Sequence, residues 1–328
     1  MQKLLPLIQN ETLKIWKKKR FLVIVLILLA IIPVFTYAEL KTLRHNASVF
    51  ENWRSQVLQQ MTDIENSLSS DRMPEEWKRQ RRVLVQQLQY YLDHDVNPAA
   101  QSAATFTRDF MHNAVTLLIP VLVLALASDL VSGERTDGTI KLLLTKPVRR
   151  WRILFSKLAA LSLYVSLIVV LTAVLSYFVS GLAFGYGGWF MPVFTGFVLD
   201  GTAVDASFVH SVPQWLYILM ELGLAWASSM TVAVLSLMVS ILLRSTSASI
   251  VTMTSVLISG TILSNMSSSW QTPKYLFSVN LNLMNYLNGS PPPVEGMTFS
   301  FSAAVLAVWA AGALAVSFAV FTKQDILN

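Results

Sequence analysis

Apolar residues along the chain fall into six long runs that are separated by polar segments. Each run is long enough for a helix, at about 1.5 Å per residue, to cross roughly 30 Å of hydrocarbon. We therefore predict an all-α membrane protein with six transmembrane helices. The expected spans cover residues 21–39, 107–131, 153–184, 214–243, 249–265 and 301–322.

The polar segments are not uniform. Residues 1–20 combine apolar positions with the basic run Lys17–Arg20, which is typical of an amphipathic helix at the membrane interface. In 40–106, apolar residues recur every three or four positions on both sides of a break at Asp71–Pro74, which predicts a helical hairpin. The remaining connections are expected at 132–152, 185–213, 244–248, 266–300 and 323–328.

The connection 266–300 has a pattern of its own. Leu281, Met284 and Leu287 are spaced as on one face of a short helix. Such a helix either lies at the membrane interface or re-enters the outer leaflet, and the sequence leaves both alternatives open.

Charge indicates the orientation. Only 13% of the 328 residues are charged and 54% are hydrophobic, and the net charge of +6 comes largely from residues 1–20 and the segment 132–152. Short loops rich in Lys and Arg stay in the cytoplasm. We expect both termini and 132–152 to be cytoplasmic, with 40–106, 185–213 and 266–300 outside a bacterial cell membrane. The excess charge then attracts membrane lipids and indicates no nucleic-acid partner.

A secretory signal peptide is the alternative interpretation of the first apolar run, with cleavage after Ala38. The run is long for the apolar region of a signal peptide, which usually has about 7 to 15 residues. We therefore favour a retained span.

The connection between the second and third runs is the most informative part of the chain. Glu134 and Asp137 would stand at the start of a short helix, where the positive end of the helix dipole favours acids. The helix would carry the apolar residues 140 and 142–144 and end before Pro147. Four apolar residues in a row indicate a surface that a partner covers, although a solvated basic loop is the simpler alternative.

The same segment resembles the signature of type-2 ATP-binding-cassette (ABC) exporter permeases. The resemblance is carried by Asp129, Glu134, Gly138-Thr139, Leu143-Leu144, Pro147-Val148, Arg150 and Lys157. It implies that 132–152 is an elbow carrying a coupling helix that docks on a separate ABC ATPase subunit. The residues to which it assigns ATPase coupling are Glu134, Asp137, Gly138, Thr139, Ile140, Leu143, Leu144, Pro147 and Arg150.

The resemblance also implies a complete assembly. Two permeases, either two copies of this chain or this chain with a homologous permease, would work with two ATPases that bind ATP and Mg²⁺. This chain would hold no cofactor. The hairpin 40–106 departs from the smallest members of that family, and it would cap the exit, recruit an extracellular accessory protein or stabilise the dimer.

Motifs for catalysis are missing from the sequence. No glycine precedes a lysine, so there is no phosphate-binding P-loop, and neither His-Glu-x-x-His nor Gly-x-Ser occurs. The absence of cysteine excludes disulfides and cysteine-based metal sites. We therefore expect a protein that is not itself an enzyme.

Glu221 is the one acid that stands well inside an expected span. A charge there costs at least about 2.5–3.5 kcal/mol, so its side chain should face protein or water. It is a candidate residue of a gate or translocation path. The structural alternative is a hydrogen bond to a nearby hydroxyl or to Arg108–Asp109.

A second class of function remains open on the sequence alone. The chain could be a membrane sensor or scaffold whose outer hairpin binds a ligand or accessory protein and signals through the elbow. A co-purifying ATPase would favour transport, and a co-purifying kinase or regulator would favour sensing.

Overall fold

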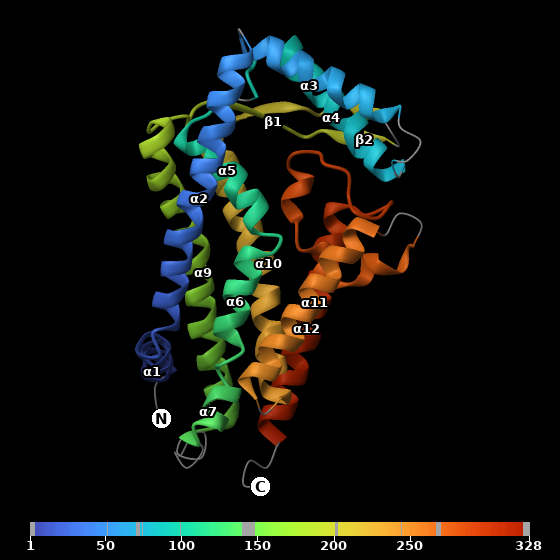
Figure 1. Ribbon diagram of the computed structural model, residues 1–328. Coiled ribbons are helices and arrows are strands. Elements are labelled where there is room, and N and C mark those ends of the chain that lie inside the picture. The colour runs from blue at the N-terminus through green and yellow to red at the C-terminus, as the bar shows by residue number, and fades with distance from the viewer. Residues whose placement is uncertain are drawn as a thin grey trace.

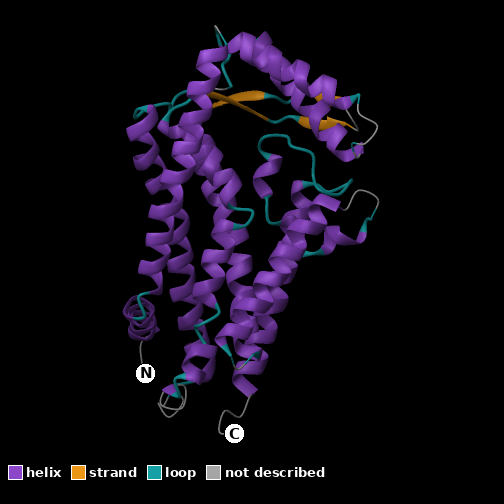
Figure 2. Cartoon of the chain, in the orientation of Figure 1, coloured by secondary structure: helices purple, strands orange, loops and turns teal. Residues whose placement is uncertain are grey.

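The structure is a computed structural model, and it is mostly helical (Figures 1 and 2). It describes residues 4–50, 52–69, 73, 75–98, 100–139, 148–200, 203–243, 245–266 and 270–323. The helices are α1 (Leu4–Lys17), α2 (Arg20–Val49), α3 (Trp53–Leu68), α4 (Glu75–Asp93), α5 (Ala103–Ala114), α6 (Leu118–Ala127), α7 (Ser132–Thr136), α9 (Arg150–Phe184), α10 (Gln214–Leu242), α11 (Thr246–Met266) and α12 (Phe299–Lys323). Short 3₁₀ helices η1 (Thr272–Tyr275), η2 (Phe277–Asn280) and η3 (Leu283–Tyr286) precede α12.

Five of these helices, α2, α9, α10, α11 and α12, are long and apolar enough to cross a membrane. The buried core lies where α2, α5, α6, α9 and α10 meet. On the outward face of α2, large apolar side chains such as Val34 and Phe35 are more than half exposed. Apolar surface of this extent is stable in hydrocarbon and not in water, so the chain has the character of a multi-pass membrane protein.

The expected second span is a bent pair of helices. α5 and the helical segment that starts at Leu118 together pass as one span, with a bend of 60° between them. The expected span over 107–131 is therefore interrupted at residues 115–117, which belong to neither helix. Pro120 explains the break, because it has no N–H to donate to the carbonyl of Thr116 and its ring crowds the preceding turn.

One end of the molecule, which we call the hairpin end, carries α3 and α4 (Figure 1). The two helices pack through an apolar cluster that includes Val57, Ile64 and Leu88. α2 runs on to Val49, well past residue 39 where we expected the first span to end. Part of the segment 40–106 is therefore an extension of α2.

Four short strands lie against α4 at the hairpin end. They are β1 (Pro192–Thr195), β2 (Val198–Asp200), β3 (Ala203–Asp205) and β4 (His210–Pro213), with β1 antiparallel to β4 and β2 antiparallel to β3. Tyr90 packs edge-on against Phe194 and Phe197, which joins α4 to the strands. The all-α prediction is wrong here, because strands of three or four residues are too short to show an alternating pattern in the sequence.

The connection before α12 packs into the helix bundle. The Ser228 hydroxyl donates to the carbonyl of Leu281 at 2.7 Å, and Met284 is fully buried. Ser228 stands 14 residues into α10 (228 − 214), or about 21 Å from its start at 1.5 Å per residue. A segment that reaches this depth favours the re-entrant alternative over a helix lying at the interface.

The opposite end, which we call the elbow end, gathers segments that are far apart in the sequence. α1, α7 and the last turn of α12 all lie there (Figure 1). α7 of the elbow therefore lies at the same end as α1 and the last turn of α12, and α3 and α4 lie at the other end.

Candidate functional site

A cluster of charged side chains joins α1, α7 and α9 at the elbow end, and we call it the charge cluster. Its members are Glu11, Lys14, Lys18, Arg20, Asp129, Glu134 and Lys157. α1 ends at Lys17 and α2 begins at Arg20, with Lys19 between them in a left-handed conformation (φ 56°). The sharp turn lets α1 lie across the foot of α7 and α9.

Lys157 is the centre of the charge cluster. Its side chain is 1% exposed, and its Nζ lies 2.8 Å from both Glu11 Oε2 and Glu134 Oε2. The Nζ also donates to the carbonyl of Leu130 at 3.0 Å. A buried ammonium is tolerated only when it is paired and hydrogen-bonded, and Lys157 meets both conditions.

Lys14 completes the inner part of the charge cluster. Its Nζ lies 2.7 Å from Glu11 Oε1 and 2.8 Å from Glu134 Oε1, so that both carboxylates bridge two lysines. Burial alone would lower the pKa of Lys14, but the attraction of Glu11 and hydrogen bonds to Glu11 and Glu134 outweigh it and raise that pKa. Lys14 therefore keeps its proton at neutral pH, and α1 stays paired with α7.

Asp129 forms the outer part of the charge cluster. Its carboxylate lies 2.8 Å from Lys18 Nζ and 2.9 Å from Arg20 Nη2. It also lies directly against Gly133, one turn further along the chain. A Cβ atom on Gly133 would stand 2.0 Å from Asp129 Oδ1, so only glycine fits here while Asp129 keeps its partners.

We expect Gly133→Ala to lower the free energy of unfolding by roughly 1–3 kcal/mol, because the added methyl group displaces the Asp129 carboxylate from Lys18 and Arg20. Thermal unfolding of the purified protein in a mild detergent measures the change. Gly223→Ala is the matched control, since a Cβ there meets nothing within 4 Å. Equal melting temperatures for the two variants would contradict this account of Gly133.

The predicted coupling residues separate into three groups. Glu134 lies in the first turn of α7, and its side chain is buried in the charge cluster. Asp137, Gly138 and Thr139 are exposed just beyond it, and Gly138 has a positive φ of 68° that favours glycine. Ile140, Leu143, Leu144 and Pro147 lie outside the described residues.

Arg150, the first residue of α9, lies near the end of the chain. Its Nη1 donates to the carbonyl of Thr322 in the last turn of α12 at 3.4 Å. The start of α9 is thus attached to α12 through Arg150, and to α1 and α7 through Lys157.

Sequence reasoning missed Glu11, Lys14 and Lys18 as partners of the elbow. The pattern of residues 1–20 predicts an interfacial helix and their positive charge predicts an orientation, but neither indicates a partner in the elbow. One signal was available: Glu11 and Lys14 are three residues apart and share a helix face with the apolar Ile15. An acid on the face of a helix that also carries its apolar residues indicates a buried partner.

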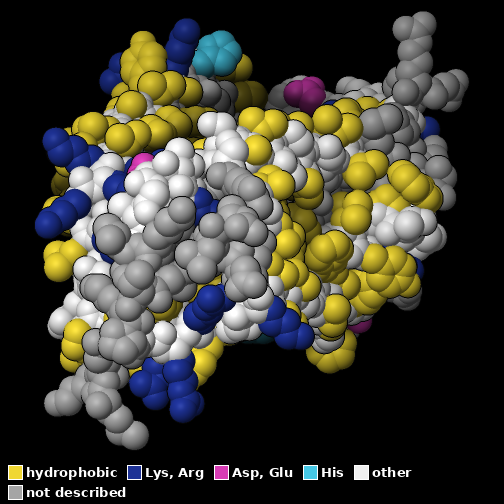
Figure 3. Space-filling model, turned by 90° about the horizontal axis from the view of Figure 1, so that it is seen from below, with side chains coloured by type: hydrophobic (Ala, Val, Ile, Leu, Met, Phe, Trp, Pro, Cys, Tyr) yellow, Lys and Arg dark blue, Asp and Glu magenta, His cyan; other side chains and the backbone are white. Residues whose placement is uncertain are grey.

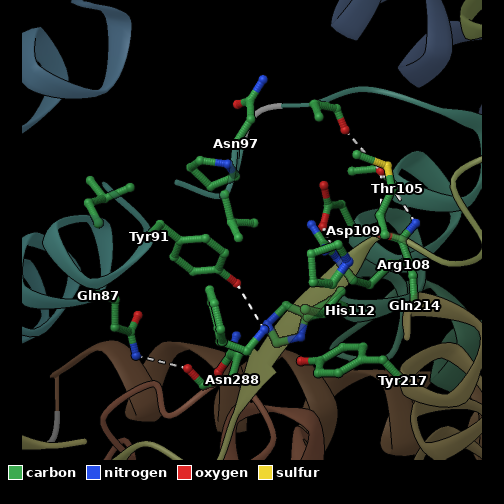
Figure 4. A pocket seen from close by; sticks show the side chains of 18 of the residues that line it. Gln87, Tyr91, Asn97, Thr105, Arg108, Asp109, His112, Gln214, Tyr217 and Asn288 are labelled. Carbon is green, nitrogen blue, oxygen red and sulfur yellow. Dashed lines mark hydrogen bonds and ion pairs between the residues drawn. The ribbon is translucent and has the colours of Figure 1, made fainter. Parts of the chain in front are cut away.

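Glu221 lines a cavity of about 510 Å³ at the hairpin end. Arg108, Asp109, His112 and Tyr217 line the same cavity and are labelled in Figure 4. The side chain of Glu221 is 1% exposed, and within the described residues neither carboxylate oxygen has a hydrogen-bond partner. His112 Nδ1 lies 3.9 Å from Glu221 Oε1, which is too far for a hydrogen bond. The hydrogen bond to a hydroxyl or to Arg108–Asp109 that the sequence offered as an alternative is not formed there, because Arg108 Nε pairs with Asp109 Oδ1 at 2.9 Å.

Within the described residues no group of three or more His, Cys, Asp or Glu side chains could hold a metal ion. The functional features of the structure are thus the charge cluster at the elbow end and cavities at the hairpin end.

Comparison with known proteins identifies two relatives, and one of them aligns over nearly the whole chain. The uncharacterized protein YhcI of Bacillus subtilis (strain 168) is 25% identical over 331 aligned residues, which cover 99% of this chain and all of YhcI. The uncharacterized membrane protein YdbK of the same organism is 25% identical over 215 residues, which cover 65% of this chain and 80% of YdbK. A family model described as protein of unknown function (DUF2705) matches residues 77–327, which is more than half of the chain. The chain therefore belongs to the DUF2705 family.

Proposed function

We propose that this chain is the permease subunit of an ABC exporter and that a separate ATPase subunit drives it through the elbow 132–152. The observation that carries the proposal is the charge cluster, which ties the base of the elbow to two other helices through buried ion pairs. Asp137, Gly138 and Thr139 are exposed directly beyond this anchored base, and Asp137 Oδ2 lies 3.3 Å from Lys18 Nζ. An exposed segment on an anchored base can bind a partner and transmit the partner's movement to the helices.

The mechanism follows from these attachments. When ATP closes the partner ATPases, the elbow moves with them, and the Lys14–Glu134 and Lys157–Glu134 pairs pass the displacement to α1 and α9. Through Lys18 and Arg20, Asp129 passes it to the start of α2. ATP thereby favours one of two arrangements of the bundle, which is the energetic basis of alternating access.

The proposal includes a topology. It takes α5 with α6 as one bent span, which gives six spans, and places both termini and the elbow in the cytoplasm. On the face seen from the elbow end, Lys and Arg side chains gather along the left side and the lower centre, and few acids are seen (Figure 3). Such a distribution supports a cytoplasmic position for this face. Two copies of the chain, or one copy with a homologous permease, would form the path in the membrane.

Cysteine crosslinking tests the proposal, because the natural chain has no cysteine to replace. We expect Thr139→Cys, in the exposed part of the elbow, to form a crosslink with an ATPase of the cassette type in intact membranes. A membrane-impermeant maleimide should label it only after the cells are permeabilised. Ser207→Cys, exposed between β3 and β4, is the control: it should be labelled on intact cells and give no crosslink to the ATPase.

Two outcomes would contradict the proposal. The first is labelling of Thr139→Cys on intact cells, which would put the elbow outside. The second is a crosslink to a kinase or another regulator in place of an ATPase. That result would favour the alternative function, a sensor that signals through the elbow, for which the large cavity beside α4 is the supporting observation.

A further inference from the structure

We propose that a groove between α2 and the bent pair α5–α6 binds a cationic amphiphile, a single hydrocarbon chain that carries a primary ammonium group. The groove has a volume of about 460 Å³, within the range of sites for small molecules. Its floor is apolar and its rim is polar. The apolar residues are Ile31, Phe35, Phe106, Phe110, Ala114, Leu117, Leu118 and Val121, and the polar residues are Glu39, Gln101, Asp109 and Asn113.

The position of the groove matches the bilayer. Glu39 stands 19 residues into α2 (39 − 20), or about 28 Å from its start, so the polar rim lies near one edge of the hydrocarbon. The apolar floor, with Ile31 two turns below, points toward the bilayer centre. Phe35 and Leu117, which line the groove, are 56% and 41% exposed, so the groove opens toward lipid. A chain from the surrounding membrane can enter it with its head group at the rim.

The hydrogen bonds of the rim select a donor. Gln101 donates its amide N–H to Glu39 Oε1 at 3.1 Å, and Asn113 donates its own to the carbonyl of Asp109 at 2.8 Å. Both side-chain amides therefore donate their N–H groups to atoms of the protein. Gln101 Oε1 is buried without a partner among the described residues. A buried acceptor without a partner costs free energy until a donor reaches it.

The charges of the rim select a cation. Glu39 and Asp109 are acids, and the base beside them, Arg108, has its Nε on Asp109 Oδ1 at 2.9 Å. A primary ammonium has three N–H donors and one positive charge. Its three N–H donors match three acceptors, Glu39, Gln101 Oε1 and Asp109, and its positive charge matches the acids. An anion would be repelled by the acids, and a ligand with acceptors alone would leave Gln101 Oε1 without a donor.

The groove also adjoins the cavity that contains Glu221. Asp109 and Asn113 line both spaces, and Asp109 is seen among the side chains of that cavity in Figure 4. A head group held at Asp109 therefore lies next to the larger polar space beneath α4. This inference concerns binding alone and requires neither an ATPase nor a transport cycle.

A fluorescence quenching experiment on the whole chain tests the proposal. A fluorophore attached to Ile27→Cys, one turn below Ile31 on α2, reports on the groove, and one attached to Val308→Cys on the exposed face of α12 reports on the surrounding lipid. The protein is placed in phosphatidylcholine nanodiscs, and three nitroxide-labelled alkyl probes are added. The probes carry a primary ammonium, a trimethylammonium or a hydroxyl head group.

We expect the primary ammonium probe to quench position 27 at a concentration at least about threefold lower than it quenches position 308. The alcohol probe should quench both positions alike. The trimethylammonium probe has charge but no N–H donor, so its preference for position 27 should be weaker than that of the ammonium probe and stronger than that of the alcohol. Glu39→Gln should remove most of the preference for the ammonium probe, whereas Glu65→Gln, a matched loss of charge on the exposed face of α3, should keep it. Equal quenching at 27 and 308 by all probes, or an unchanged preference in Glu39→Gln, would overturn the proposal.

Discussion

Replacing Lys157 with methionine should lower the free energy of unfolding by about 3–5 kcal/mol, which is the range for a buried ion pair that loses one partner. Methionine fills a similar volume but leaves the Glu11 and Glu134 carboxylates with Lys14 alone, and it leaves the carbonyl of Leu130 without its donor. The thermal unfolding midpoint in detergent measures the loss. The side chains of Glu11 and Glu134 are only 4% and 8% exposed, so neither carboxylate can replace the lost partner with water.

Two further variants make this prediction specific. Lys17→Met removes the same charge from an exposed position of α1 and should change the unfolding midpoint little. Adding Glu134→Gln to Lys157→Met should recover part of the loss, because one uncompensated acid is removed with it. If Lys157→Met had the same thermal unfolding midpoint as the wild type, Lys157 would not be the centre of the charge cluster.

The long helices could be predicted from the sequence because their signal is local. A run of about twenty apolar residues indicates a span whatever surrounds it, and α9, α10 and α12 agree with the predicted spans to within about three residues at each end. The bend at residues 115–117 had a visible cause in Pro120. The bend angle could not be predicted from the sequence, because the packing of neighbouring helices determines how far a proline bends a span.

The charge cluster shows why the site could be predicted only in part. Asp129, Glu134 and Lys157 were singled out by resemblance, and the structure brings them together at the foot of α9. Glu134 and Lys157 find partners in α1, 120 and 146 residues earlier in the chain, and Asp129 pairs with Lys18 and Arg20 just after α1. No periodicity connects positions so far apart. The placement of α1 depends on the turn at Lys19 and on tertiary packing.

The short strands were missed for a related reason. β1 and β4 pair across Val193 and Val212, but each strand is too short to show a pattern of its own. What stabilises them is contact with α4, where Tyr91 packs edge-on against Phe194 and accepts a hydrogen bond from the Phe194 amide at 3.4 Å. This contact lies outside the local sequence that a pattern can report.

Removing Lys14 and Glu134 together should uncouple the elbow from α1 without unfolding the bundle. In the double variant Lys14→Met/Glu134→Gln, Glu11 keeps its ion pair with Lys157, so no buried charge is left uncompensated. The direct α1–α7 ion pair of the inner charge cluster is lost, while the α1–α9 link remains. Under the proposed function, a push on the elbow then reaches α1 less effectively.

We expect the stimulation of ATP hydrolysis that follows association of the permease with its ATPase to fall about tenfold, within the usual range of coupling between sites. It is measured on the purified complex, with thermal unfolding and ATPase binding recorded beside it to show that the bundle and the complex persist. Lys17→Met/Glu65→Gln, which removes one base and one acid from exposed positions, is the matched control and should keep wild-type stimulation. If the Lys14/Glu134 variant also kept it, the ion pairs of Lys14 and Glu134 would not be needed for coupling, and the links that remain, Lys157 with the carbonyl of Leu130 and Asp129 with Lys18 and Arg20, would have to carry it.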